Sequence, residues 1–384
     1  YLAYCGLHLA QIGLLEGIYH ATSIVCEIPS GAAADLWGRK RCMVLSNLCI
    51  AVSCVIMLFS KSFGWFAVSF AVQALGNNLN SGSEEALVYD SMKCLGQEEH
   101  YMGVYGRLNV LIEVAQGLAT VAGGVLAEFS YFWCYAACVV IAVLALLPVL
   151  GMAEPPQCGK AADTAGGSAK DAPAEGTPAQ RTIWETVKHH FAVSACILQK
   201  DAKIGKIIGF YSVVFAAHTL LFFYSQQYFA DFGYNKVQIS VIMLLVGGAS
   251  CLGALASEKM YRRFGKRCLI PETVIIAAAI LCYGSGKAGV AAAALMCAGF
   301  ANAALYPIQS DSLNALIPSE QRATLISVDS MCFSIAMIVL FPLAGALADR
   351  WGLKTVLLLL GAILLLFLLT VFCIEKESFS SDHS

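Results

Sequence analysis

The sequence has little charge. Only 13% of its 384 residues are Asp, Glu, Lys or Arg, whereas about a quarter of the residues of a soluble domain are charged. Hydrophobic residues make up 58% of the chain, and the mean hydropathy is +0.70. Too little polar surface remains to face water, so most of the surface must face lipid. A backbone in lipid has to be satisfied within helices or a closed barrel, and apolar runs of about 20 residues have the length of spanning helices.

Several motifs of other protein classes are also missing. There is no HExxH, GxSxG or P-loop sequence, which argues against a membrane-embedded enzyme and against ATP as the energy source. There is no CxxC and no Cys/His cluster with zinc spacing, and most of the 16 cysteines lie inside apolar runs. We therefore predict no metal and no cofactor. A net charge of −2 gives no indication of a nucleic-acid partner.

Eleven apolar runs are long enough to be complete helical spans. They cover residues 11–35, 42–60, 64–92, 104–127, 131–152, 204–230, 237–258, 268–286, 288–314, 323–347 and 353–374. Tyr1 to His8 are expected to be the stub of a further span.

A short pattern closes the first, fourth, seventh and tenth of these spans. Its copies begin at Gly31, Gly124, Gly253 and Gly345, and an acidic residue follows each glycine by four or five positions. The first two copies are 93 residues apart and the last two are 92 apart. The spacing predicts four three-helix units, paired into two six-helix bundles of inverted repeats with twelve transmembrane helices. The same spacing places the start of helix 1 roughly 18 residues before Tyr1, so most of that helix is expected to be missing.

The predicted domains follow from this repeat. Residues 1–152 form the first bundle, 153–203 a cytoplasmic linker, 204–376 the second bundle and 377–384 a short tail. Residues 157–180 are rich in Ala, Gly, Pro, Ser and Thr and are expected to be disordered. The stretch after them, with Ile183, Trp184, Val187 and Phe191 on one side, is expected to form an amphipathic helix on the membrane surface. An inner continuation of helix 7 is the alternative.

The distribution of Lys and Arg predicts the orientation. If the loop after residue 35 is cytoplasmic, 19 of the 24 basic residues lie on the cytoplasmic side and 5 on the outer side. We therefore expect a multi-pass protein of the cell membrane with both termini in the cytoplasm.

The loop after the first complete span carries a recognisable motif. It reads Gly31-Ala-Ala-Ala-Asp35-Leu-Trp-Gly38-Arg39-Lys40-Arg41 and closely resembles the G-x-x-x-D-R-x-G-R-[RK] signature of the major facilitator superfamily. The segments 27–31 and 81–90 resemble a bacterial efflux-like subgroup of that superfamily. Leu36 replaces one signature arginine, and the helix 5 antiport signature is half present, with Ala119-Thr120 before Gly123-Gly124. The resemblance therefore leaves the direction of transport open.

The resemblance implies a gating role for the motif. Gly31 and Gly345 would let helices 2 and 11 approach closely, Asp35 would face a helix N-terminus, and Arg39 would bridge Asp35 to Asp90. In similar transporters such a cluster latches the outward-facing state. The alternative is that the charges anchor the loop. The residues assigned to this role are Gly31, Asp35, Gly38, Arg39, Lys40, Asp90, Gly345 and Asp349.

Ionisable side chains deep in the spans are candidates for proton coupling, because lone carboxylates in lipid are costly and usually functional. Glu27 and Glu113 are the first choices. A structural hydrogen bond near Pro29 would explain Glu27 equally well, and His218 could be a packing residue instead of a relay. The full set is Glu27, Glu113, Glu84, Glu85, Asp329 and His218.

Aromatic and amide side chains in the spans are candidates for the substrate pocket, although ordinary packing would also account for each aromatic. They are Tyr19, Tyr211, Phe215, Gln226, Asn302, Tyr306 and Gln309. With an acidic membrane interior, the preferred function is proton-coupled export of small amphipathic or cationic molecules by alternating access. The alternative is a proton symporter that imports a small polar metabolite. Either way the partners are a small-molecule substrate, protons and the lipid bilayer, with no nucleic acid and no nucleotide.

Overall fold

The computed structural model describes residues 1–97, 100–153, 202–265, 269–314 and 322–381. The predicted linker, its amphipathic stretch at 183–191 and the last three residues lie outside this part of the chain. Within the described ranges the secondary structure is helical, without strands.

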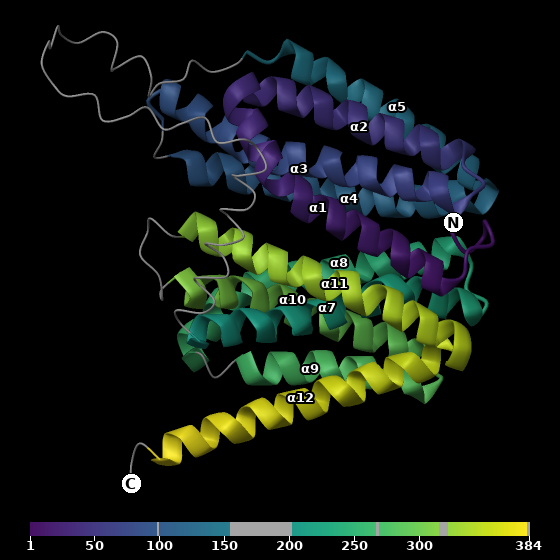
Figure 1. The fold of residues 1–384 in the computed structure, drawn as a ribbon, viewed down its shortest axis with the longest axis vertical. Coiled ribbons are helices and arrows are strands. Elements are labelled where there is room, and N and C mark those ends of the chain that lie inside the picture. The colour runs from purple at the N-terminus through teal and green to yellow at the C-terminus, as the bar shows by residue number, and fades with distance from the viewer. Residues whose placement is uncertain (98–99, 154–201, 266–268, 315–321, 382–384) are drawn as a thin grey trace, which may run out of the picture. The chain divides into compact units, whose positions relative to one another are not determined.

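Eleven α-helices fill the described ranges (Figure 1). They are α1 (Leu9–Trp37), α2 (Arg39–Phe59), α3 (Phe63–Cys94), α4 (Tyr101–Phe129), α5 (Tyr131–Gly151), α7 (Ala202–Asp231), α8 (Lys236–Phe264), α9 (Leu269–Cys282), α10 (Ala288–Asn314), α11 (Arg322–Trp351) and α12 (Leu353–Ser381), and the short 3-10 helix η3 (Tyr283–Ser285) continues α9. Each corresponds to one predicted span, so the all-helical prediction is confirmed. By length and apolar composition, eight of the described helices could cross a membrane, and α9 with η3 forms a shorter apolar segment.

Two helices extend well beyond their predicted ends. The predicted span ended at residue 258, but α8 continues to Phe264. An ion pair of 2.6 Å between Glu258 and Arg262, one turn apart, supports the extra turn, and Gly265 ends it with a φ of 58°. The last helix, α12, likewise runs to Ser381, past the predicted end at 374.

The first residues differ from a helical stub. Residues 1–7 form a turn closed by hydrogen bonds from Cys5 N to the Tyr1 oxygen (2.9 Å) and from Leu7 N to the Leu2 oxygen (3.2 Å). Gly6 has a φ of 87°. This left-handed conformation is open to glycine and interrupts a helix, so α1 begins only at Leu9.

The chain divides into two compact units. The first contains residues 1–17, 117–131 and 196–384, and the second contains 18–116 and 132–195. In the first unit, α10 packs against α8 and α9, α12 against α9, and α11 against α7. Its main apolar cluster has Tyr283, Phe229 and Phe341 among its largest fully buried side chains, and a smaller cluster forms around Ile208.

In the second unit, α2 packs against α3 along a seam of small side chains. A Cβ on Gly76 of α3 would lie 3.1 Å from the Cys49 Cβ of α2. Deeper in the same seam the hydroxyls of Ser53 and Ser69 are 3.0 Å apart, and the Ser69 hydroxyl also donates to the Ser53 carbonyl at 2.9 Å. Small residues and buried hydroxyl pairs are the usual way to join helices in lipid, because hydrophobic burial offers no drive there.

Candidate functional site

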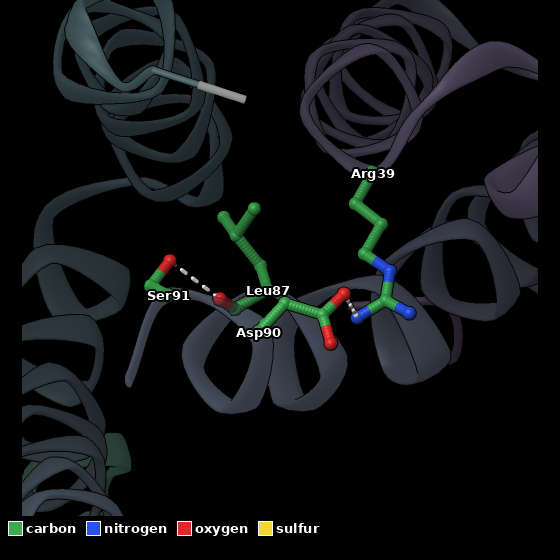
Figure 2. A network of polar contacts seen from close by, with 4 residues as sticks. All are labelled: Arg39, Leu87, Asp90 and Ser91. Atoms are coloured by element: carbon green, nitrogen blue, oxygen red, sulfur yellow. Dashed lines mark hydrogen bonds and ion pairs between the residues drawn. The ribbon is translucent and has the colours of Figure 1, made fainter. Parts of the chain in front are cut away.

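The signature loop is held to α3 by an ion pair. The guanidinium of Arg39, at the start of α2, lies 2.6 Å from a carboxylate oxygen of Asp90 near the end of α3 (Figure 2). Both side chains are partly exposed, at 24% and 35%. Beside it, within one turn of α3, the Ser91 hydroxyl donates a hydrogen bond of 2.7 Å to the Leu87 carbonyl. The contact predicted between Arg39 and Asp90 is therefore present, and its role as a latch stays a prediction.

Among the neighbouring motif residues, Lys40 makes a defined contact with another helix. The Asp35 side chain lies outside the described atoms. No described atom would come within 4 Å of a Cβ on Gly31. Gly38 separates α1 from α2 with a φ of 93°, and the Lys40 ammonium donates to the Leu150 carbonyl at the end of α5, at 2.8 Å.

The copy of the pattern at the end of α11 makes a defined contact with the start of α1, within the first unit. The Asp349 carboxylate accepts hydrogen bonds from the backbone N–H groups of Leu9 (3.0 Å) and Ala10 (2.8 Å). These are the first two residues of α1, where N–H groups are free and negative charge is favoured. A Cβ on Gly345 would lie 2.6 Å from the Leu9 carbonyl carbon. Asp349 thus caps α1, and Gly345 lets the two helices approach closely enough for it to do so.

The copy at the end of α4 is built in the same way, also within the first unit. The Glu128 carboxylate accepts from the backbone N–H of Lys236, the first residue of α8, at 3.2 Å. A Cβ on Gly124 would lie 2.5 Å from the Ser240 Cβ of α8. The Lys236 ammonium returns a hydrogen bond of 2.6 Å to the Ala127 carbonyl. Two copies of the repeat therefore place a glycine against another helix and cap that helix with an acid.

A second group of residues comes together on α7, α10 and α11 of the first unit. Its aromatic part is a row of three rings. The Tyr211 and Phe215 rings of α7 stack at 6.0 Å, and Phe215 lies 5.9 Å from the ring of Tyr306 on α10. Tyr211 is buried, whereas Tyr306 is 60% exposed, so the row leads from the bundle core to an open ring face.

Polar side chains flank this aromatic row. The Gln309 amide, itself buried, donates to both carboxylate oxygens of Asp329 on α11, at 3.2 and 3.3 Å. His218 Nε2 and Asn302 Oδ1 are shielded from solvent and have no hydrogen-bond partner among the described residues. Buried polar atoms normally find a partner, so these two leave hydrogen bonds unmade in this conformation.

Helix geometry places the two unpaired atoms at a similar height along the axes of α7 and α10. His218 lies three residues after Phe215 on α7, and Asn302 lies four residues before Tyr306 on α10. Successive spans alternate in direction, so α7 and α10 run antiparallel and both steps lead to the same side of the Phe215–Tyr306 contact. Steps of three and four residues keep the same helix face. The cluster of Tyr211, Phe215, His218, Asn302, Tyr306, Gln309 and Asp329, called here the α7–α10–α11 cluster, therefore combines ring faces with unpaired hydrogen-bonding groups.

Other predicted residues lie elsewhere. In the second unit, Tyr19 on α1 accepts a hydrogen bond of 2.8 Å from Asn77 on α3, and Asn78 donates to the Ser23 hydroxyl at 3.0 Å. Together these contacts form a polar seam between α1 and α3.

The predicted acids of the second unit lie on three of its helices, α1, α3 and α4. Glu84 accepts from Asn80 at 2.9 Å on its own helix. Glu27 is half-buried on α1, two residues before Pro29, while Glu113 on α4 is exposed. The Glu85 side chain lies outside the described atoms. In the first unit, Gln226 is exposed on α7, away from the cluster.

A family model described as the Major Facilitator Superfamily matches residues 2–286 and 272–382, which together span almost the whole chain. The chain belongs to the Major Facilitator Superfamily. It is therefore a multi-pass membrane transporter rather than an enzyme.

Relatives of known sequence agree with this membership. An uncharacterized MFS-type transporter, YxaM of Bacillus subtilis (strain 168), is 20% identical over 93% of this chain and 85% of its own length. An uncharacterized transporter of Buchnera aphidicola subsp. Schizaphis graminum (strain Sg) is 28% identical over 35% of this chain, and this chain spans only 34% of that relative's length.

Solved structures share the superfamily fold. A point-mutant form of the nucleoside transporter NupG is similar with a TM-score of 0.79 at 12% identity, over 96% of this chain and 92% of that one. A D-xylose-proton symporter is similar with a TM-score of 0.66 at 14% identity, over 96% and 90%. At these identities the likeness shows the fold alone.

One buried acid of this transporter escaped the sequence analysis. Glu272 in the first turn of α9 is 1% exposed, and neither carboxylate oxygen has a hydrogen-bond partner in the described ranges. It lies close to a predicted span end, where an acid at a helix N-terminus is common, so its position alone gave no signal. The caps formed by Asp349 and Glu128 were also missed, because they join residues more than 100 positions apart.

Proposed function

We propose that this transporter moves a small, uncharged polar metabolite that carries a ring, coupled to protons, by alternating access. The observation that carries the proposal is the pair of buried, unpaired polar atoms on Asn302 and His218, one helical turn from the Phe215–Tyr306 ring contact. A ligand that hydrogen-bonds to both atoms would relieve the cost of burying them unpaired, about 1–3 kcal/mol each.

The ring faces favour the same class of ligand. An aromatic or sugar ring packs well against Tyr or Phe, and aromatic contacts contribute about 0.5–1.5 kcal/mol beyond the buried area. An amide oxygen and an imidazole nitrogen recognise hydroxyl or N–H groups rather than a full charge. A nucleobase or a sugar offers both a ring and such groups, whereas a purely apolar drug offers only the ring.

Asp329 is the proposed proton carrier of the cluster. As a carboxylate it accepts from the Gln309 amide on α10. Once protonated on one oxygen it would gain an O–H donor there, so one of its two contacts with the Gln309 amide would have to change. A proton on Asp329 would therefore change the contact between α10 and α11 beside the ligand, which is the kind of link that coupling requires.

Import is the proposed direction. Two solved transporters with this fold are named as a nucleoside transporter and a D-xylose-proton symporter, and both names refer to ring-bearing polar metabolites. Their likeness supports the choice of compounds to be tested first.

Export of cationic amphiphiles is the second candidate function. It is supported by the acids Glu27 and Glu84 on α1 and α3 of the second unit, together with the motif resemblance at residues 27–31 and 81–90. Carboxylates in the transport pathway would attract a cation.

The deciding experiment uses the full chain in proteoliposomes with an imposed inward proton gradient. Radiolabelled nucleosides and pentoses form one panel and cationic dyes the other, and luminal pH is followed in parallel. Nucleoside or pentose accumulation with luminal acidification is the expected result. Asn302→Leu should reduce this uptake at least tenfold, while Gln226→Leu, which removes an exposed amide outside the cluster, should leave it unchanged.

Asp329→Asn separates coupling from binding. This variant should lose gradient-driven accumulation but keep exchange of labelled for unlabelled substrate, since exchange needs no net proton movement. If only cationic dyes move, and preloaded dye leaves the lumen as protons enter, the import proposal is wrong and the second candidate holds.

A further inference from the structure

A groove lies on the second unit between α2 and the end of α5. Its volume is about 740 Å³, and it is lined by Trp37, Gly38, Lys40, Arg41, Val44, Leu45, Leu48, Leu150, Met152 and Ala153. The lining comes from the α1–α2 turn, one face of the first turns of α2, and the last residues of α5. The groove thus lies where two spanning helices end, at the border between bilayer and water.

The two parts of the groove differ in character. At the helix ends it is cationic, with Lys40 and Arg41, and none of the described lining residues is acidic. Further along α2 it is apolar, with Leu45 and Leu48 exposed at 37% and 44%. Arg41 and Leu48 are seven residues apart, about 10 Å along a helix. A charged end followed by an apolar wall of this length matches a phospholipid headgroup followed by the upper part of an acyl chain.

Arg41 is the residue best placed to bind a phosphate. Its side chain is exposed and makes no ion pair with any residue in the described ranges. A guanidinium offers donors in a fork that fits phosphate oxygens. Lys40 contributes positive charge while its ammonium donates to the Leu150 carbonyl, which joins the two walls. Trp37, 55% exposed beside them, is the type of side chain that favours the headgroup region.

We propose that this groove binds an anionic phospholipid, with its phosphate at Arg41 and Lys40 and an acyl chain along Leu45 and Leu48. A zwitterionic lipid would bring a cation into a site that already holds two, so the groove selects net negative lipids. The site is separate from the α7–α10–α11 cluster, and the proposal does not depend on the substrate or on the direction of transport.

The test uses Trp37 as a local reporter of the bound lipid. The full chain is placed in phosphatidylcholine nanodiscs, with Trp37 kept and the other four tryptophans replaced by phenylalanine: Trp65, Trp133, Trp184 and Trp351. Brominated phosphatidylglycerol should quench Trp37 fluorescence more strongly than brominated phosphatidylcholine at the same mole fraction. Arg41→Gln should reduce this preference about fivefold, the usual effect of one surface cation on anionic lipid binding.

Lys93→Gln is the matched control. It removes one exposed cation from the last turn of α3, outside the groove, and should leave the preference unchanged. Native mass spectrometry of the protein with all tryptophans intact gives an independent measurement, in which Arg41→Gln should retain fewer phosphatidylglycerol molecules than wild type.

Three results would overturn the proposal. Equal quenching by the two brominated lipids would show that the groove does not select negative lipid. An equal loss in Lys93→Gln would show general surface attraction instead of a site. The third result is competition by free phosphate. If millimolar inorganic phosphate removes the preference and a chloride salt of equal ionic strength does not, the groove binds free phosphate instead of lipid.

Discussion

Glu272 is the buried acid on α9 without a hydrogen-bond partner among the described residues. The residue is only 1% exposed. A buried carboxyl group without a partner is costly, whether it stays charged or takes up a proton. Glu272→Gln keeps the size of the side chain and removes the charge, so we expect it to raise the thermal unfolding midpoint of the purified transporter.

Glu258→Gln serves as the control for this measurement. Glu258 is 72% exposed in its pair with Arg262, and surface pairs of this kind contribute about 0–1 kcal/mol. Its replacement should barely change the midpoint. A lower midpoint for Glu272→Gln would mean that the acid has a stabilising partner in the folded protein.

Single residues of the α7–α10–α11 cluster were largely predictable, but their arrangement was not. Tyr211, Phe215 and Tyr306 were named as aromatic side chains inside predicted spans, with ordinary packing as the alternative for each. Their grouping depends on which helices become neighbours, which a single sequence does not specify. Gln226, predicted for the same pocket and also on α7, is exposed, and its part in the pocket stays a prediction.

At the scale of helices, the glycine contact between α4 and α8 can be tested with adjacent residues of α4. A Cβ on Gly124 would lie 2.5 Å from the Ser240 Cβ, while one on Gly123 would meet no described atom within 4 Å. Gly124→Ala should therefore destabilise the transporter by about 1–3 kcal/mol, the usual cost of overpacking.

Gly123→Ala should instead be neutral or slightly stabilising, since alanine is favoured over glycine in a helix by about 1 kcal/mol. The thermal unfolding midpoints of Gly124→Ala and Gly123→Ala, measured in one detergent, test this difference. Equal destabilisation would show that the close approach of α4 and α8 is not maintained in solution.

The cap on α1 makes a prediction about amide exchange. Asp349 accepts from the N–H groups of Leu9 and Ala10, and a charge at a helix N-terminus contributes about 0.3–1 kcal/mol. Asp349→Asn should therefore speed hydrogen exchange in a peptide covering residues 8–14 by about two- to fivefold. Unchanged exchange in this peptide, with Glu258→Gln as a reference, would show that the cap is not formed.

Helix positions were predicted closely and helix ends less well. The apolar length that a bilayer demands fixes where a span lies, so all eleven predicted spans coincide with helices. Beyond the bilayer a helix can continue at little cost, as α8 does through Glu258 and Arg262. That continuation depends on local ion pairs and on Gly265, and hydropathy does not report either of them.

At the scale of the whole molecule, orientation remains a prediction from the basic residues. With 19 of 24 on one side, the rule for short loops places both termini in the cytoplasm. A green fluorescent protein fused after Ser384 should fluoresce, and alkaline phosphatase fused at the same place should be inactive. A fusion in the α11–α12 turn, after Gly352, should give the opposite result, and reversed signals would refute the orientation.

The division into halves shows where sequence reasoning ends. The repeat spacing predicted bundles of residues 1–152 and 204–376, and this division stays a prediction. The compact units of the structure cut across it, because the start of α1 and the end of α4 group with α7–α12. The caps of Asp349 and Glu128 are among the contacts within the first unit, and they join residues more than 100 positions apart.

The polar seam between α1 and α3 has a consequence for biosynthesis. Asn77 and Asn78 of α3 are satisfied by Tyr19 and Ser23 of α1, and an amide left unpaired in hydrocarbon is costly. During translation α1 and α2 leave the ribosome before α3, so the partners of α3 are already present when it reaches the bilayer. The order of the helices in the chain thus allows a poorly lipid-soluble segment to enter the membrane without ever facing lipid alone.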